Sequence, residues 1–160
     1  MLALVGAAAQ AEPTDLAVKA AFLPRFARYV TWPSPAMPKA GDPFVLCVIG
    51  NDPFGSMLDQ AASSQMIDGR RIVVRRLDTT AGSDTCQIAF VGGRSGQAIA
   101  AMGSKPVLTV TDANNDGPRG IIHFAVVNGR VRFFIDQAAA AHRGLAISSR
   151  LLALALGVKQ

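Results

Sequence analysis

The sequence predicts an α/β fold, a single layered domain with a mixed, mostly parallel sheet, helices on both faces and a C-terminal antiparallel hairpin. Three observations carry this prediction. Residues 44–49 are consecutively apolar, as in a strand that is buried on both faces of a helix-covered sheet. Further apolar segments alternate with short helical patterns as far as residue 112. Asn128-Gly129 then separates two β-rich segments, which is a strong hairpin signal.

Length, composition and charge narrow the classes of protein. The chain has 160 residues, of which 50% are hydrophobic and 17% charged, so it can bury a core and does not resemble a disordered chain. Its net charge is +5. In an intracellular protein this charge would suggest nucleic acid as a partner, whereas in an exported one it favours an acidic protein surface or anionic lipid headgroups.

The first eleven residues resemble part of an export signal. They form an apolar run that ends in Ala9-Gln10-Ala11, the small-x-small pattern that a signal peptidase recognises. A basic amino-terminal part is missing, so we interpret residues 1–11 as the remnant of a signal peptide and residues 12–160 as the exported domain. The alternative is a frayed helical extension.

If the protein is exported, its two cysteines, Cys47 and Cys86, are exposed to an oxidising compartment. An even number of cysteines in an oxidising compartment favours a disulfide. The bond would close a loop of 86 − 47 = 39 positions, which the chain-entropy model values at about 3–4 kcal/mol, less any strain. The alternative is a pair of buried thiols. Metal binding is poorly supported, because His123 and His142 lie far away along the chain.

The amino-terminal part predicts an amphipathic helix over residues 14–29. Thr14 is its candidate N-cap, and Pro24 should kink it. Apolar side chains recur every three or four positions, so the predicted inward face consists of Val18, Phe22, Phe26 and Tyr29. A proline-rich loop follows as far as the strand at 44–49.

After that strand, Asp52 can cap a helix over 53–64, with Pro53 at its first position. Arginines at both ends of a predicted strand over 70–77 are typical of a solvated sheet edge. The remaining elements of this part are strands over 87–91 and 106–111 and a helix over 95–102.

The carboxy-terminal part begins with the hairpin, which joins residues 120–127 to 130–135. Asp136 then caps a short alanine-rich helix over 137–142. We expect a final helix over 145–156. Its sides are nearly all apolar, so it should be buried against the sheet, with Gly157 as a left-handed terminator.

The sequence gives little support for catalysis. It has no Gly-x-Ser-x-Gly elbow, and the turn at 50–55 lacks the glycine spacing of a nucleotide-binding loop. Residues 92–96 suit an anion better, although a glycine-rich turn without a ligand is the commoner case. A lone histidine in a strand, as at His123, is usually a hydrogen-bonded structural side chain. We therefore expect no enzyme, no metal and no cofactor.

Two kinds of binding function remain open. A small-ligand site would lie where the parallel strands end, in a crevice formed by Asn51, Asp52, Gly92, Gly93 and Asp112. A protein-interaction module would instead present an exposed apolar patch ringed by polar groups. The candidates for that patch are the hairpin near Asn128 and the loop at Trp32. The alternative for Trp32 is that it closes the core.

Several pieces of the sequence, in this order, resemble the family of small periplasmic YfiR-type proteins. The pieces are Val18-Lys-Ala-Ala-Phe-Leu23, Phe26-Ala-Arg-Tyr-Val-x-Trp-Pro33, Leu46-Cys-Val-Ile-Gly-Asn-Asp-Pro-Phe-Gly55, Gly69-Arg-x-Ile-x-Val-Arg-Arg-Leu77, Cys86 with its strand, Val107-Leu-Thr-Val-x-Asp112, Gly129-Arg-Val-Arg-Phe133 and Gly144-Leu-x-Ile-Ser-Ser-Arg-Leu-Leu152.

The resemblance implies a periplasmic α/β domain that acts without catalysis. Known members bind the periplasmic sensor domain of an inner-membrane diguanylate cyclase and repress the enzyme, which lowers cyclic-di-GMP signalling and biofilm formation. The resemblance therefore implies this membrane-anchored cyclase as the partner, with no nucleic acid and with a homodimer as a further possibility. Cys47 and Cys86 match a cysteine pair of the family, whose redox state is thought to modulate its action.

Overall fold

The computed structural model describes residues 14–93, 95–112 and 117–160. The strands are β1 (Val30–Thr31), β2 (Phe44–Ile49), β3 (Met66–Ile67), β4 (Arg70–Leu77), β5 (Ile88–Val91), β6 (Leu108–Asp112), β7 (Ile122–Val127), β8 (Arg130–Asp136), β9 (Ala146–Ile147) and β10 (Gly157–Lys159). The α-helices are α1 (Asp15–Phe26), α2 (Ser56–Ser63), α3 (Ser95–Met102), α4 (Gln137–His142) and α5 (Ser149–Leu154). Short 3₁₀ turns are η1 (Ala27–Tyr29), η2 (Ser34–Ala36) and η3 (Ser83–Thr85).

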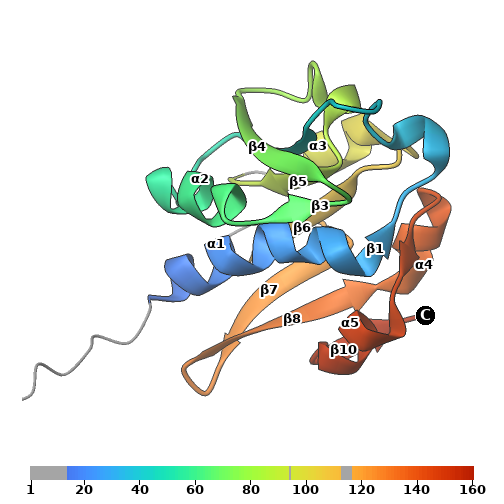
Figure 1. Ribbon diagram of the computed structural model, residues 1–160. Coiled ribbons are helices and arrows are strands. Elements are labelled where there is room, and N and C mark those ends of the chain that lie inside the picture. Colours follow the sequence, from blue (N-terminus) through green and yellow to red (C-terminus); the bar gives the residue numbers. More distant parts are fainter. Residues whose placement is uncertain (1–13, 94, 113–116) are drawn as a thin grey trace, which may run out of the picture.

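These strands form an eight-stranded sheet in the order β10-β8-β7-β6-β5-β2-β4-β3, and β1 pairs with β9 in a separate small sheet (Figure 1). The neighbours from β4 across to β7 run parallel, and β7 and β8 form the antiparallel hairpin. The predicted α/β class and mixed sheet are confirmed. Among the described residues, no helix is both long enough and apolar enough to cross a membrane.

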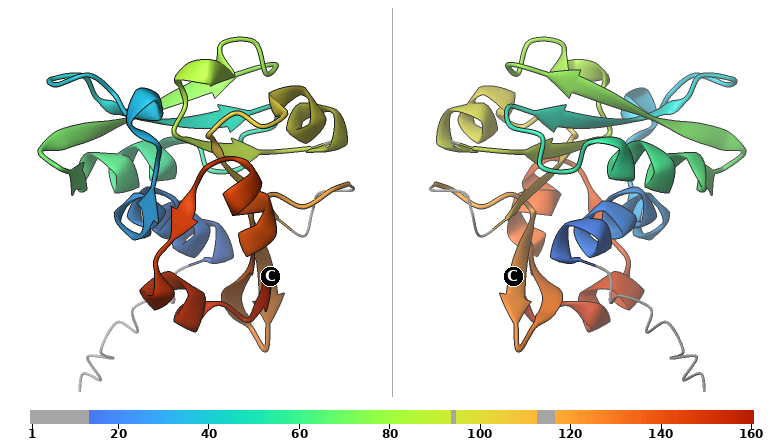
Figure 2. Two further views of the ribbon diagram at one scale, coloured as in Figure 1. Left: turned by 90° about the vertical axis from the view of Figure 1, so that its right-hand side faces the viewer. Right: turned by 90° about the vertical axis from the view of Figure 1, so that its left-hand side faces the viewer.

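The side chains of β2 point alternately to the two faces of the sheet, and they belong to two separate hydrophobic clusters. Leu46 and Val48 belong to a large cluster that also holds residues of α1 and α2, whereas Cys47 and Ile49 belong to a smaller cluster with Met102 of α3. Neighbouring side chains of a strand point to opposite faces, so helices cover both faces of this part of the sheet, as Figure 2 shows. The consecutive apolar residues of β2 are explained by this double burial.

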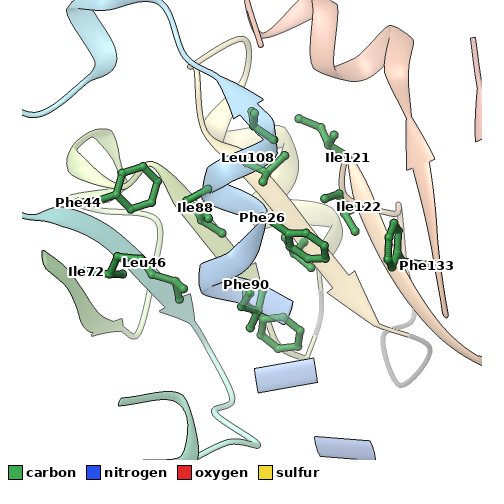
Figure 3. Packing of buried hydrophobic residues seen from close by; sticks show 14 of the residues in the cluster. Phe26, Phe44, Leu46, Ile72, Ile88, Phe90, Leu108, Ile121, Ile122 and Phe133 are labelled. Carbon is green, nitrogen blue, oxygen red and sulfur yellow. The ribbon is translucent and has the colours of Figure 1, made fainter. Parts of the chain in front are cut away.

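Helix α1 begins as predicted, because the Thr14 hydroxyl accepts a hydrogen bond from the backbone N–H of Ala17 at 3.1 Å. Its inward face is only partly the predicted one. Phe26 is buried, and its ring lies against Phe124 and Phe133 in the core (Figure 3). The half-buried Phe22 also contacts both rings. The α-helix ends at Phe26, and the predicted residue Tyr29 lies in the tighter turn η1, outside the α-helical period.

The helix predicted over 53–64 begins later, at Ser56. The carboxylate of Asp52 accepts hydrogen bonds from the N–H groups of Phe54 and Gly55 at 2.9 and 3.3 Å. It therefore stabilises the turn before the helix, and Pro53 lies in that turn. Gly55 is the actual N-cap, with φ 55° and ψ −139°, a backbone conformation that is essentially restricted to glycine.

The single helix predicted over 145–156 is wrong. Ser148 has extended dihedrals and donates its N–H to the Tyr29 carbonyl at 2.7 Å, which continues the pairing of β9 with β1. The helix is therefore limited to α5, and Leu154 is 57% exposed instead of buried. Gly157 begins strand β10 beside β8. A Cβ there would lie 3.1 Å from the Phe134 ring, so close packing, and not a left-handed turn, explains the glycine.

Gln87, which directly precedes β5, forms hydrogen bonds to four other parts of the chain: β2, the turn at Ala36, the Trp32 side chain and β6. Its Oε1 accepts from the Val45 N–H of β2 at 2.7 Å, and its Nε2 donates to the Ala36 carbonyl at 3.0 Å. Its own carbonyl accepts from Trp32 Nε1 at 3.0 Å and from the Leu108 N–H of β6 at 2.9 Å. The side chain is 95% buried, because Gln87 is only 5% exposed. Its polar atoms are therefore satisfied by protein groups instead of water.

We predict that Gln87→Met lowers the free energy of unfolding by about 1–3 kcal/mol, since methionine fits the space but leaves the Val45 N–H and the Ala36 carbonyl without this partner. Urea denaturation measures the change. Gln60→Met is the matched control, because Gln60 is exposed on α2. Equal stability losses in the two variants would contradict the role given to Gln87.

Candidate functional site

Cys47 and Cys86 are joined in a disulfide, with their Cα atoms 5.9 Å apart. Cys47 lies in the middle of β2, and Cys86 immediately precedes Gln87 at the start of β5. Both are buried in the cluster that contains Met102 of α3. The bond therefore lies in the core and links two neighbouring parallel strands, a position suited to holding the fold together.

The strand-end residues Asn51, Gly92 and Gly93 lie together. A Cβ on Gly92 would lie 2.0 Å from the Asn51 carbonyl oxygen, and one on Gly50 would lie 2.7 Å from the Gly92 carbonyl oxygen. The backbones that leave β2 and β5 are thus in direct contact. This close approach explains the glycine at position 92. It also leaves no room for an anion between the segment that follows β2 and the segment that follows β5.

Asp52 is turned away from these glycines, toward β4 and α2. Its Oδ2 accepts from Arg76 Nε at 2.7 Å, and Arg76 also binds both carboxylate oxygens of Asp59 at 3.1 and 2.8 Å. Burial raises the pKa of Asp52, but the hydrogen bonds from Arg76, Phe54 and Gly55 outweigh it, so the pKa lies below its usual value. The hydrogen bonds from Arg76 likewise lower the pKa of Asp59.

Asp112 is the last residue of β6 and forms a buried ion pair with Lys19 of α1, at 3.4 Å. The side chains are 6% and 7% exposed. This pair lies on the α1 side of the sheet, whereas Asp52 pairs with Arg76 of β4. The two carboxylates are therefore engaged in separate ion pairs, each with a structural function.

A hollow of about 330 Å³ does exist at the strand ends, but other residues form most of it. Its lining residues are Ile49, Gly50, Asp78, Thr79, Thr80, Val91, Gly92, Gln97, Ala98 and Ala101. Of the five predicted crevice residues, only Gly92 lines it. The structure thus places the predicted residues near the same edge of the sheet without assembling them into one pocket.

Trp32 lies in the core and is only 6% exposed. Its ring meets the Phe44 ring edge-on, with centroids 5.2 Å apart, and its Nε1 donates to the Gln87 carbonyl. Trp32 therefore closes the core, the alternative that the sequence left open. It is not available as a docking residue.

Asn128 is exposed at the tip of the hairpin, and both it and Gly129 have positive φ, 53° and 75°. The exposed apolar side chains Val126 and Val127 precede it. Across β8, the Leu156 N–H donates to the Phe133 carbonyl at 2.7 Å, which brings the segment after α5 beside this hairpin. We call the exposed residues of this region, namely Val126, Val127, Leu154 and Leu156, the hairpin patch. Val126 lies on the face of the hairpin that carries Phe124, and Val127 lies on the opposite face.

Sequence reasoning did not find Leu154 and Leu156, because it placed them in a buried helix. Their exposure follows from the break at Ser148 and the start of β10. A signal was present: Ser148-Ser149 is a helix-start pattern inside the predicted helix. The same elements carry arginines, since Arg130 is exposed and Arg132 half-buried on β8 and Arg150 is exposed on α5.

Comparison with protein families gives a match to the model described as YfiR/HmsC-like, over residues 16–156. The match covers most of the chain, so the protein belongs to the YfiR/HmsC-like family. This is a family of regulatory, non-catalytic proteins. Comparison with curated proteins gives no match.

We predict that Arg76→Gln destabilises the protein by roughly 1 kcal/mol at neutral pH, a value kept small because the arginine and its partners are partly exposed. The lowered pKa values of Asp52 and Asp59 mean that the ion pairs contribute stability above the usual carboxyl pKa of 3.8. That contribution is lost as the pH falls through the lowered values.

The difference between wild type and Arg76→Gln should therefore shrink on acidification, as measured by urea denaturation at pH 7 and pH 3. Arg71→Gln serves as the control, because Arg71 is exposed on the same strand and is not part of this ion-pair cluster. If the stability difference between wild type and Arg76→Gln is the same at pH 7 and pH 3, the ion pairs with Asp52 and Asp59 do not contribute the predicted pH-dependent stability.

Proposed function

We propose that the protein is a periplasmic regulator that binds the periplasmic sensor domain of an inner-membrane diguanylate cyclase and represses the enzyme. Repression would lower cyclic-di-GMP signalling and biofilm formation. The observation that carries the proposal is the match to the YfiR/HmsC-like family over residues 16–156. The match includes both cysteines, the hairpin and α5.

Export to the periplasm is supported by two features. Residues 1–11 have the apolar run and the Ala9-Gln10-Ala11 pattern of a signal peptide, and they lie outside the described residues. The disulfide between Cys47 and Cys86 suits an oxidising compartment. We propose residues 12–160 as the exported domain.

We propose the hairpin patch as the docking surface. Exposed apolar side chains in the centre with polar groups around them are typical of a protein interface. Val126 is 46% exposed and Leu154 57%, and each can therefore bury further apolar area on binding. The exposed arginines Arg130 and Arg150 favour an acidic surface on the partner, because complementary charge speeds and orients association.

Ligand binding at the strand ends was the other hypothesis, and it loses support. Asp52 and Asp112 are held by Arg76 and Lys19, and the glycine backbones touch. A homodimer also remains a prediction without support from the contacts described above.

The proposal is tested by titrating the purified oxidised protein with the purified periplasmic domain of a membrane diguanylate cyclase encoded beside it, in a calorimeter. We expect saturable binding. Val126→Asp should weaken it at least tenfold, because a charge replaces an apolar side chain at the proposed contact. Met66→Asp is the matched control, since Met66 is 55% exposed on β3, at the opposite edge of the sheet.

Three results would count against the proposal. Failure of the folded wild-type protein to bind would refute the cyclase as partner. Equal weakening by Val126→Asp and Met66→Asp would refute the hairpin patch as the docking surface. Unchanged binding in Val126→Asp would do the same, and circular dichroism of each variant would exclude loss of folding as the cause.

A further inference from the structure

A hollow of about 600 Å³ lies on the face of β7, β8 and β10 that is turned away from α1. Its lining comes from these three strands and from residues 118–121 before β7. The residues that matter for the argument are Pro118, Arg119, Ile121, His123, Phe134 and Lys159. None of them belongs to the hairpin patch or to the predicted strand-end crevice.

The register explains which side chains face this hollow. Thr111 of β6 is aligned with His123 of β7, His123 with Phe134 of β8, and Phe134 with Gly157 of β10. Their neighbours Phe124 and Phe133 belong to the cluster on the α1 face, so this row lies on the opposite face. On that face, the cluster under α3 includes residues of β2 and β5 but none of β7 or β8.

A glycine keeps the hollow open on its outer side. A Cβ on Gly157 would lie 3.1 Å from Cδ1 and 3.3 Å from Cε1 of the Phe134 ring. Any larger side chain at position 157 would therefore push against Phe134 and narrow the space between β8 and β10.

The charged groups at the hollow are mainly cationic. The guanidinium of Arg119 lies over the Phe134 ring, with its Cζ 5.1 Å from the ring centroid. A cation on an aromatic face is held in place without neutralising its charge. In the part of the chain that the structure describes, Arg119 forms no ion pair. Lys159 lies 3.9 Å from Asp136, which is the one carboxylate among the described residues that line the hollow.

His123 adds a polar group to the floor. Its Nδ1 lies 2.8 Å from the Thr111 hydroxyl, and the same hydroxyl accepts the Gly120 N–H at 2.9 Å. Burial lowers the pKa of His123, and the positive charge of Arg119 lowers it further. In the neutral tautomer whose Nδ1 accepts from the Thr111 hydroxyl, the ring carries its proton on Nε2 and can donate from there.

The other walls are apolar. The half-buried Phe134 and the exposed Pro118 line the hollow, and Ile121 and Ile135 are buried at its base. Apolar walls with a few fixed polar groups are typical of a site for a small molecule. Net cationic groups select an anion, and a planar guanidinium suits a carboxylate, with which it can form two parallel hydrogen bonds.

We propose that this hollow binds a small organic carboxylate with an aliphatic body, whose carboxylate pairs with Arg119 and whose carbon chain lies against Phe134 and Pro118. The site uses none of the residues of the hairpin patch, so its binding can be tested without a cyclase.

Hexanoate is the probe, and hexanamide is its neutral isostere. In heteronuclear NMR titrations of the full protein, hexanoate should shift the amide signals of Gly120, His123 and Gly157 with a Kd of about 1 mM, the range expected for so few non-hydrogen atoms. Hexanamide should bind at least fivefold more weakly. Inorganic phosphate, an anion without an apolar body, should also bind more weakly.

Arg119→Gln should weaken hexanoate binding at least fivefold, whereas Arg71→Gln, at an exposed position near the other edge of the sheet, should leave it unchanged. Gly157→Val should also weaken binding by narrowing the hollow. The proposal is overturned if hexanoate shifts none of these signals, if hexanamide binds equally well, or if Arg119→Gln binds hexanoate like the wild type. Phosphate binding as tight as hexanoate would reduce the site to a general anion contact and overturn it too.

Discussion

The bond between Cys47 and Cys86 fixes the place where the separate parts of this fold meet. Gln87 follows Cys86 directly, and its hydrogen bonds reach β2, β6, the Ala36 turn and the Trp32 side chain. The loop before β2, which follows α1, is thus tied to the same point as the two central strands. Reduction of the disulfide would remove the covalent link between Cys86 and β2 and leave the hydrogen bonds of Gln87 and the pairing of β2 with β5 to hold the two strands together.

Much of the fold could be predicted because its signals are local. The double burial of β2, the N-caps at Thr14 and Asp136, and the positive φ of Asn128 and Gly129 all follow from short stretches of sequence. The carboxy-terminal helix could not be delimited in this way. It begins late because Ser148 pairs with Tyr29, a residue more than a hundred positions away, and no periodicity within residues 145–156 encodes that partner.

For the candidate site too, the local sequence predicted the positions of the residues but not their interaction partners. The strand ends were predicted correctly, so Asn51, Gly92 and Asp112 do lie at one edge of the sheet. Their function depends on partners that the local sequence does not reveal, such as Lys19 for Asp112. Toward the β10 edge of the sheet, β7 exposes Val126 and Val127, the segment from α5 onward exposes Leu154 and Leu156, and β10 borders a cationic hollow.

The central claim, that this protein represses a diguanylate cyclase from the periplasm, is tested most directly by measuring cellular cyclic-di-GMP. The protein is produced with an efficient export signal in cells that carry the membrane diguanylate cyclase it binds, and the nucleotide is quantified by mass spectrometry. The account predicts a marked fall relative to cells without the protein, and no fall when the cyclase lacks its periplasmic domain. An unchanged cyclic-di-GMP level, with the folded, oxidised protein present in the periplasm, would contradict it.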